Sequence, residues 1–326
     1  MSKQNVILHL SDLHFGWGGR EAEEADRRLA LNGLLESIER LEDSWKPTLL
    51  CVSGDIGWRG KEGDYESAAR WFEELFKRTG IARDSVIVCP GNHDVNREVS
   101  QRYARPTAPT GADNILAVPI PDYLKQAFTA YEKFCRDVGI VPVSVGKYDS
   151  YLVGQRETGG ISFVVCNSAW FCQDDEDHGR LWIGLPLLKS LEANEQLPQP
   201  SRLRSHKPTI ALIHHPREWL AEAELRASEM PNRPNTFDYL VKRCHLLLSG
   251  HTHGEVRAAD QLAGGAFHLS GGASYAGAAQ FNSYRLVRVD ADSFVYQSFE
   301  FDPRSAENKW SQKEDARRLL LQRRTD

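Results

Sequence analysis

The chain has 326 residues, of which 41% are hydrophobic and 26% charged, and this composition excludes a disordered protein. No apolar run reaches the roughly 18 residues that a membrane-spanning helix needs. The net charge of −5 argues against a protein that follows nucleic acid along a broad basic surface. The amino-terminal stretch MSKQNVILHLSDLH enters an apolar run without the features of a secretory signal, so we expect a cytoplasmic protein.

Apolar, β-branched runs recur along the chain and predict buried strands. They span residues 6–12, 48–55, 85–91, 161–170, 209–216 and 245–251. Continuous runs of this kind are typical of strands that are covered on both faces, so the sequence predicts a layered α/β protein. Helical periodicity predicts helices in 27–41, 64–80 and 185–197. After residue 262, shorter runs predict an antiparallel meander that adds a second sheet.

Three further segments complete the prediction of a single domain over residues 1–326. Residues 96–122 are rich in Pro, Thr, Gly and Arg, so we expect a long loop within a lid-like insertion at about 96–135 that lies over the site. Residues 172–182 form an acidic loop after a strand. The basic tail at about 311–324 is predicted to be a surface helix.

Metal-binding residue types stand where these strands end, which is where open α/β sheets place their sites. Two carboxylates, one amide and four imidazoles exceed the ligands of one tetrahedral ion and suit two divalent ions that share a carboxylate. The sequence therefore predicts a binuclear metal centre, whose positive charge would attract phosphate. The predicted ligands are Asp12, His14, Asp55, Asn92, His214, His251 and His253.

Five sequence blocks carry a resemblance to a known family. ILHLSDLHFG, VSGDIGWRG, CPGNHD, LIHHP and SGHTHG occur in the order and approximate spacing of the calcineurin-like metallophosphoesterases, from about residue 6 to 275. The segment GDIGWRGKEGDYESAARWF looks most like the branch of class III cyclic-nucleotide phosphodiesterases and glycerophosphodiesterases. The resemblance implies a four-layer α/β/β/α sandwich of two mixed sheets, and hydrolysis of a phosphoester by a metal-bound hydroxide.

The resemblance also implies a role for each site residue. His93 would contact the phosphate or protonate the leaving oxygen, and Asp94 would orient His93. Mixed oxygen and nitrogen ligands tolerate manganese, iron or zinc. One metal would be bound by Asp12, His14, Asp55 and His253, and the other by Asp55, Asn92, His214 and His251, with Asp55 bridging the two.

Other residues near these blocks have two interpretations each. Arg59 stands where serine/threonine protein phosphatases have a phosphate-contacting arginine, but it is equally a solvated residue at the start of a helix. His215 either faces the substrate or packs on the face opposite His214. Trp58 replaces the metal-binding tyrosine of purple acid phosphatases and argues against that branch. Three tryptophans either stack on a base or pack in the core: Trp17, Trp170 and Trp182.

We expect a phosphodiesterase whose substrate is a small diester, such as a cyclic nucleotide, rather than extended nucleic acid or a membrane. A nuclease is the first alternative, although the capping domain and coiled coil of the family's repair nucleases are not found. A phosphomonoesterase is the second, because Arg97, Arg102 and Arg105 are candidates for binding a phosphate dianion. A non-catalytic scaffold is disfavoured, because scaffold members tend to have lost ligands that are all present here.

Overall fold

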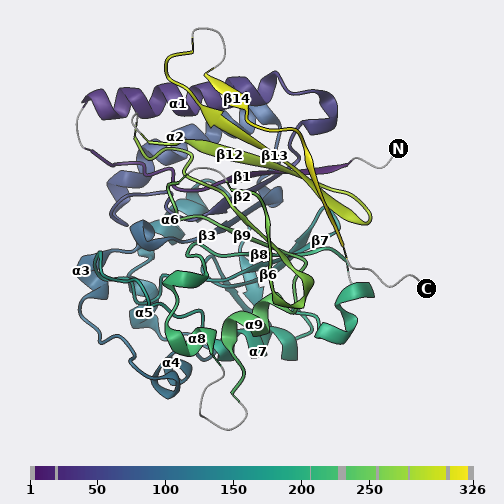
Figure 1. Ribbon diagram of the computed structural model, residues 1–326. Coiled ribbons are helices and arrows are strands. Elements are labelled where there is room, and N and C mark those ends of the chain that lie inside the picture. The colour runs from purple at the N-terminus through teal and green to yellow at the C-terminus, as the bar shows by residue number, and fades with distance from the viewer. Residues whose placement is uncertain are drawn as a thin grey trace.

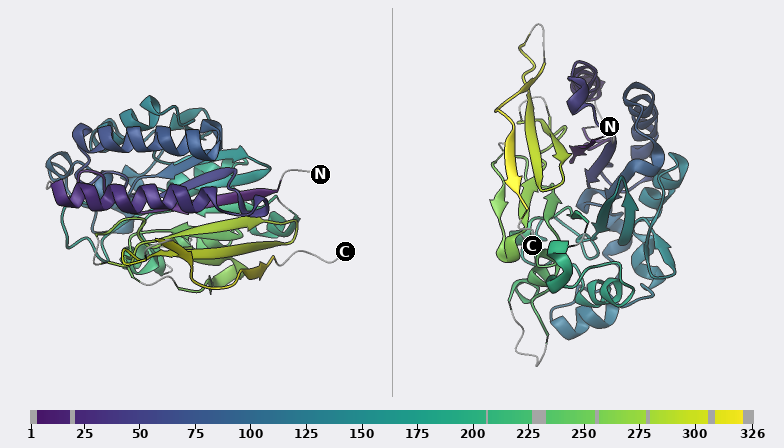
Figure 2. Two further views of the ribbon diagram at one scale, coloured as in Figure 1. Left: turned by 90° about the horizontal axis from the view of Figure 1, so that it is seen from above. Right: turned by 90° about the vertical axis from the view of Figure 1, so that its right-hand side faces the viewer.

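The computed structural model describes residues 4–18, 21–205, 207–226, 233–254, 257–277, 280–305 and 309–321. Two mixed sheets face each other, and helices cover their outer faces (Figures 1 and 2). The fold is therefore the four-layer α/β/β/α sandwich that the resemblance implies.

The first sheet joins the amino-terminal strands to the end of the described chain. Its order is β14-β13-β12-β1-β2-β3, and β15 also pairs with β13. The parallel pairing of β1, β2 and β3 brings their carboxyl ends to one edge. The strands are β1 (Asn5–Leu10), β2 (Leu49–Ser53), β3 (Val86–Cys89), β12 (Ser283–Val289), β13 (Ser293–Phe301), β14 (Trp310–Gln312) and β15 (Arg317–Leu320).

The second sheet has the order β10-β11-β9-β8-β7-β6-β4-β5. Here β7, β8, β9 and β11 run parallel, so their carboxyl ends also share an edge. The strands are β4 (Val143–Val145), β5 (Tyr148–Ser150), β6 (Gly154–Thr158), β7 (Ile161–Val165), β8 (Thr209–Leu212), β9 (Leu246–Ser249), β10 (Asp260–Gln261) and β11 (Phe267–Ser270).

Helices α1 and α2 lie side by side in the layer outside the first sheet (Figure 2). The α-helices are α1 (Glu21–Glu39), α2 (Glu62–Thr79), α3 (Arg97–Ser100), α4 (Pro109–Ile115), α5 (Asp122–Gln126), α6 (Thr129–Asp137), α7 (Leu185–Ala193), α8 (Glu222–Leu225) and α9 (Thr236–Val241). Short 3₁₀ helices span Asp43–Trp45, Arg83–Ser85, Asn92–Asp94, Pro200–Ser205, Arg217–Trp219 and Ala263–Gly265. Among the described residues, no helix is long and apolar enough to cross a membrane.

The strands are buried on both faces, as their continuous apolar runs predict. Ile7 and Cys51 of the first sheet share an apolar cluster with Phe163 and Leu212 of the second. The alternating residues of the same strands, such as Leu8, belong to the cluster that includes the helices. Burial of both faces explains why these strands lack a polar side in the sequence.

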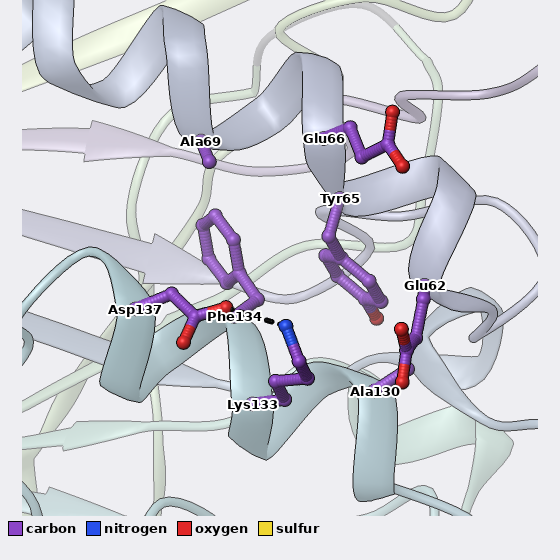
Figure 3. Close-up of a pocket in the computed structure, with 8 residues that line it drawn as sticks. All are labelled: Glu62, Tyr65, Glu66, Ala69, Ala130, Lys133, Phe134 and Asp137. Atoms are coloured by element: carbon purple, nitrogen blue, oxygen red, sulfur yellow. Dashed lines mark hydrogen bonds and ion pairs between the residues drawn. The ribbon is translucent and has the colours of Figure 1, made fainter.

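The sequence of helix α2 explains both its buried face and the residue at which it ends. Tyr65, Phe72 and Leu75 fall on one stripe and are buried, and Gly80 ends the helix with a φ of +70°. A cavity of about 220 Å³ is lined by residues of α2 and α6, and Lys133 pairs with Asp137 at its rim (Figure 3). This cavity contains none of the predicted ligands.

Two predictions about the end of the chain are wrong. The strands β12 and β13 extend the first sheet, because β12 pairs with the free edge of β1, and the second sheet is built from β4 to β11. The predicted surface helix at 311–324 is instead the strands β14 and β15, which hydrogen-bond to the edge of β13. An unpaired strand edge offers backbone partners that outweigh a weak helical preference. Residues 322–326 lie outside the described residues.

Within the insertion at 96–135, residues 96–122 do not form the long loop that their composition suggests. The insertion contains the short helices α3, α4 and α5, which Figure 1 shows toward the lower left, and most of α6, which packs against α2. Pro109 begins α4, where its missing N–H costs nothing, and Leu124 and Phe134 anchor α5 and α6 in the core.

Candidate metal centre

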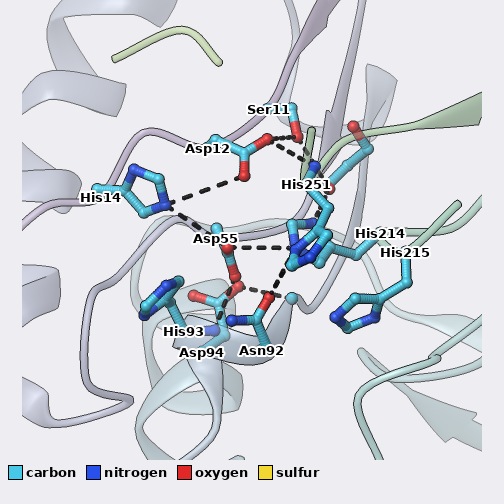
Figure 4. A network of polar contacts seen from close by, with 12 residues as sticks. Ser11, Asp12, His14, Asp55, Asn92, His93, Asp94, His214, His215 and His251 are labelled. Atoms are coloured by element: carbon cyan, nitrogen blue, oxygen red, sulfur yellow. Dashed lines mark hydrogen bonds and ion pairs between the residues drawn. The ribbon is translucent and has the colours of Figure 1, made fainter. Parts of the chain in front are cut away.

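The predicted ligands meet at the edge where the parallel strands of both sheets end (Figure 4). Asp12 and His14 follow β1, and Asp55 follows β2. Asn92 lies in the turn after β3, His214 follows β8, and His251 and His253 follow β9. The sandwich thus converts positions that are far apart in the sequence into one cluster.

The backbone at four of these positions is in the left-handed region that residues other than glycine rarely occupy. The φ values are +53° at Asp12, +49° at His14, +55° at Asp55 and +71° at His251. Such conformations are costly and persist only where the surrounding structure enforces them, typically at functional sites. One enforcing bond is donated by the His14 N–H to the Asp55 carbonyl, at 3.0 Å.

Two glycines allow the ligands to approach the backbone closely. A Cβ atom on Gly54 would lie 2.5 Å from Nδ1 of His214, and one on Gly91 would lie 2.1 Å from Oδ1 of Asp55. Both separations are far below van der Waals contact, so any other residue would displace a ligand. Glycine at positions 54 and 91 therefore has a steric origin.

The first group of ligand atoms surrounds Asp12. Its Oδ1 atom lies 3.1 Å from Nε2 of His253 and 3.9 Å from Nε2 of His14. Nε2 of His14 is also 3.5 Å from Oδ2 of Asp55. These are the four residues that the resemblance assigns to one metal.

The second group surrounds His214. Its Nε2 atom lies 3.1 Å from Oδ2 of Asp55, 3.0 Å from Oδ1 of Asn92 and 3.2 Å from Nδ1 of His251. Asp55 Oδ2 is thus within 3.5 Å of a ligand nitrogen in each group. This is the position that a bridging carboxylate requires.

Backbone carbonyls fix the orientation of two ligand imidazoles. Nδ1 of His14 donates to the Tyr275 carbonyl at 3.0 Å, and Nδ1 of His214 donates to the Ser53 carbonyl at 2.7 Å. A proton on Nδ1 leaves the lone pair of Nε2 directed at the other ligands. Both imidazoles are therefore held in the tautomer that binds a metal through Nε2.

The donor set fits two divalent cations. Nε2 of His14 and Oδ2 of Asp55 are buried without a hydrogen-bond partner, although each faces other ligand atoms. Burial would raise the pKa of Asp55, but His214 and His93 hold it well below its usual range. Burial would lower the pKa of His214, but the Asp55 and Asp12 carboxylates raise it to about 9. In the metal-free protein, protons on the imidazoles balance the negative charge of the carboxylates. Bound cations would supply this positive charge instead.

His93 lies beside the ligands, but its predicted orientation by Asp94 is wrong. Nδ1 of His93 donates to the Trp58 carbonyl at 2.9 Å, and the Trp58 ring stacks on the imidazole with centroids 3.9 Å apart. Asp94 instead accepts hydrogen bonds from the N–H groups of Gly57 and Gly91 and from the Tyr65 hydroxyl, at 2.8–2.9 Å. Asp94 therefore holds the loops that carry Asp55 and Asn92, and Trp58 positions His93.

Three of the four arginines expected to contact phosphate are engaged in ion pairs. Arg59 binds the buried Asp64 at 2.8 Å, although its own side chain is largely exposed. Arg97 pairs with Asp175 at 2.8 Å. Arg105 pairs with Asp174 at 3.0 Å and also contacts Asp177. The insertion and the acidic loop after β7 thus neutralise each other, which their separate sequences do not reveal. Arg102 is exposed.

His215 lies next to the ligands rather than on a remote face. It is 1% exposed, and its ring centroid is 4.6 Å from that of His251. Nδ1 lies 2.8 Å from the Ser168 hydroxyl oxygen, and Nε2 is buried without a partner. Two of the three tryptophans named above, Trp170 and Trp182, are buried in the core. The third, Trp17, is partly buried, and its ring centroid lies 5.9 Å from that of Trp58.

Sequence reasoning did not identify Trp58 as the support of His93 or Trp219 as a neighbour of His251. The Trp219 ring centroid is 4.0 Å from that of His251. Both tryptophans follow a ligand by three to five positions, in the loop after its strand. That proximity in sequence is the signal that could have identified them.

Comparison with known proteins agrees with this geometry. A model of the calcineurin-like phosphoesterase family matches residues 6–255, well over half of the chain. The chain therefore belongs to this family, and the match supports a metal-dependent phosphoric ester hydrolase.

Individual relatives are distant. A segment of 95 residues is 29% identical to the uncharacterized metallophosphoesterase-like protein YydB of Bacillus subtilis and covers 29% of this chain but 18% of that protein. A dimetal phosphatase from Danio rerio is 10% identical, with a TM-score of 0.50 over 97% of this chain and 99% of that one. Vacuolar protein sorting 29 from Cryptosporidium parvum is 12% identical, with a TM-score of 0.39 over 97% and 98% of the two chains. The likeness to the Danio rerio structure supports the fold alone.

Proposed function

We propose that this protein hydrolyses small phosphodiesters, such as cyclic nucleotides, with two metal ions held by the seven ligands. The observation that carries the choice of a diester is the pairing of Arg59, Arg97 and Arg105 with carboxylates. A monoester dianion needs more positive charge than a diester monoanion, and these arginines are already neutralised. The positive charge of the two metal ions is sufficient for a diester, which carries a single negative charge.

Two divalent ions, when bound, would lower the pKa of a water molecule and neutralise charge on the phosphoryl oxygens during displacement. The chain itself supplies the positions of the ligands and a buried environment. The aspartates Asp12 and Asp55 are 0% and 1% exposed. Burial strengthens the electrostatic interactions that orient an anionic substrate there.

His93 is the candidate proton donor. A ring nitrogen of His93 lies within 4.8 Å of ligand atoms of His14 and Asp55, close enough to reach a substrate oxygen bound there. Burial lowers the pKa of His93 to about 4, so the free imidazole is neutral near pH 7. A diester monoanion next to the ring would favour the protonated form, which can then donate to the leaving oxygen.

The aromatic side chains around His93 favour a substrate that carries a planar ring. The Trp58 ring, which stacks on His93, lies 5.9 Å from that of Trp17, and both are partly exposed. Indole faces bind nucleobases by stacking. This supports a nucleotide as one class of substrate.

The test is the hydrolysis of bis-p-nitrophenyl phosphate and of p-nitrophenyl phosphate by chelator-treated protein to which manganese, iron or zinc is restored. We expect metal-dependent activity with a higher kcat/KM for the diester. A preference for the monoester would replace the proposal with a phosphomonoesterase. Turnover of neither compound, combined with cleavage of single-stranded DNA or RNA, would indicate a nuclease.

A further inference from the structure

Ser11 lies between the end of β1 and the ligand Asp12, and its side chain is buried beside the metal centre (Figure 4). Ser274 fixes its backbone on both sides. The Ser11 N–H donates to the Ser274 hydroxyl at 3.2 Å, and the Ser274 N–H donates to the Ser11 carbonyl at 2.7 Å. The hydroxyl of Ser11 is therefore held at a defined position next to a ligand.

The hydroxyl of Ser11 contacts two acceptors but has one proton to donate. Its Oγ atom lies 2.5 Å from Oδ2 of Asp12 and 3.1 Å from the carbonyl oxygen of Ser53. Hydrogen bonds to charged acceptors are shorter and stronger than those to neutral ones, so the carboxylate receives the proton. The Ser53 carbonyl already accepts the hydrogen bond from His214. The Ser11 hydroxyl therefore acts on Asp12.

The two oxygens of the Asp12 carboxylate have different partners. Oδ2 accepts from the Ser11 hydroxyl and, at 3.0 Å, from the N–H of His251. Oδ1 lies 3.1 Å from Nε2 of His253, which belongs to the same group of ligands. A carboxylate oxygen has about two lone-pair sites, so the two donors use the capacity of Oδ2. Only Oδ1 is left for a cation.

Glycine at position 250 makes room for the contact between Ser11 and Asp12. A Cβ atom on Gly250 would lie 1.8 Å from Oγ of Ser11 and 2.8 Å from Oδ2 of Asp12. Both separations are below van der Waals contact, so a larger residue would displace the hydroxyl. Gly250 precedes His251, so one backbone segment both accommodates the hydroxyl and supplies the second donor to Oδ2.

We propose that Ser11 is a positioning residue of the metal centre, whose hydroxyl occupies Oδ2 of Asp12 so that Asp12 binds its metal through Oδ1 alone. The inference rests on the two-metal centre of the proposed function. A group that hydrogen-bonds a ligand fixes the orientation of that ligand, and its loss typically lowers metal affinity by about 10- to 100-fold. Asp12 belongs to one of the two ligand groups, so the effect of Ser11 is confined to the metal of that group.

Calorimetric titration of chelator-treated protein with Mn²⁺ measures the dissociation constant of each site. Two reference variants assign the constants, because His253→Ala removes a ligand from the first group and Asn92→Ala removes one from the second. Ser11→Ala is expected to raise Kd by about 10-fold or more at the site that His253→Ala weakens, and to leave the other Kd unchanged. Equal weakening of both sites, or weakening of neither, overturns the inference.

The matched control is Ser162→Ala, which removes the hydroxyl of another buried serine. Ser162 lies near the start of β7, away from the edge where the ligands meet, and its hydroxyl accepts from Nε2 of Gln155 at 3.0 Å. This variant also loses a hydrogen bond of a buried hydroxyl, yet it is expected to leave both dissociation constants unchanged. If it weakens Mn²⁺ binding as much as Ser11→Ala does, the effect is one of stability and the inference is wrong.

A crystal structure of the Mn²⁺-loaded wild type tests the inference without any variant. The expected result is a metal bound by Oδ1 of Asp12, with the Ser11 hydroxyl still on Oδ2. A metal bound by both oxygens overturns the inference, while the two-metal centre stands. Wild-type protein that binds no Mn²⁺, iron or zinc overturns the proposed function as well, so the two failures are distinguishable.

Discussion

Arg105 joins the insertion to the acidic loop after β7, and its removal tests whether this contact is structural. The Arg105 side chain is 14% exposed and that of its partner Asp177 is 4% exposed. Burial raises the pKa of Asp177, so the lone carboxylate is unfavourable once the guanidinium is gone. Breaking a fully buried pair costs about 3–5 kcal/mol, and partial exposure reduces the expected cost of Arg105→Ala to about 2–4 kcal/mol.

Urea unfolding of the metal-loaded protein measures this cost. The cycle of Arg105→Ala, Asp177→Asn and the double variant is expected to give a coupling energy of about 1–3 kcal/mol, because the two groups are in direct contact. The matched control is Arg102→Ala, which removes an exposed arginine from the same segment and is expected to change stability by at most about 0.5 kcal/mol.

The same variants separate a structural arginine from one that binds phosphate. If Arg105 only holds the two segments together, Arg105→Ala leaves the ratio of kcat/KM for the diester and the monoester unchanged. A selective loss of monoester hydrolysis, with stability unchanged, would refute the reasoning and restore Arg105 as a ligand of the phosphate dianion.

Three further predictions concern the metal centre. Asp55→Asn is expected to lower metal content and activity together, since Asp55 lies within 3.5 Å of a ligand nitrogen in each group, and full activity with both metals retained would exclude a bridging role. His93→Ala is expected to keep both metals and to lose rate mainly on diesters with poor leaving groups, as metal analysis and a leaving-group series can show; loss of metal would instead make His93 a ligand. The raised pKa of His214, about 9 against 6.5 in the unfolded chain, contributes stability to the metal-free protein that is complete below about pH 6.5 and is lost as the pH rises to about 9. The urea midpoint of chelator-treated protein should fall between about pH 6.5 and pH 9, whereas that of metal-loaded protein should not. If the two midpoints change with pH in parallel, the raised pKa of His214 in the metal-free protein is contradicted.

The strands, and the gathering of the candidate ligands at one sheet edge, were predictable because their signals are local. An apolar run such as 48–55 identifies a buried strand, and the residue that follows it lies at the sheet edge whatever the rest of the chain does. The structure accordingly brings together Asp55, Asn92 and the other five predicted ligands.

The contacts that sequence reasoning missed join segments that are distant in the chain. Asp94 neighbours His93 in sequence, yet its carboxylate reaches Gly57 and Tyr65 in the preceding loop and helix. The pairing of Arg105 with Asp177 and the pairing of β12 with β1 have the same character. Periodicity and residue type specify which groups need a partner, but the packing of the sheets decides which partner they meet.

The position of β1 in the middle of the first sheet has a consequence for biosynthesis. Asn5 pairs with Val289, so the strand that leads into Asp12 and His14 acquires one of its two neighbours only when β12 has been made. A growing chain therefore carries an apolar strand with an open edge through most of translation, and open edges promote association with other chains. Polypeptides released before residue 283 would keep that edge exposed, which makes premature termination a source of aggregation for this protein.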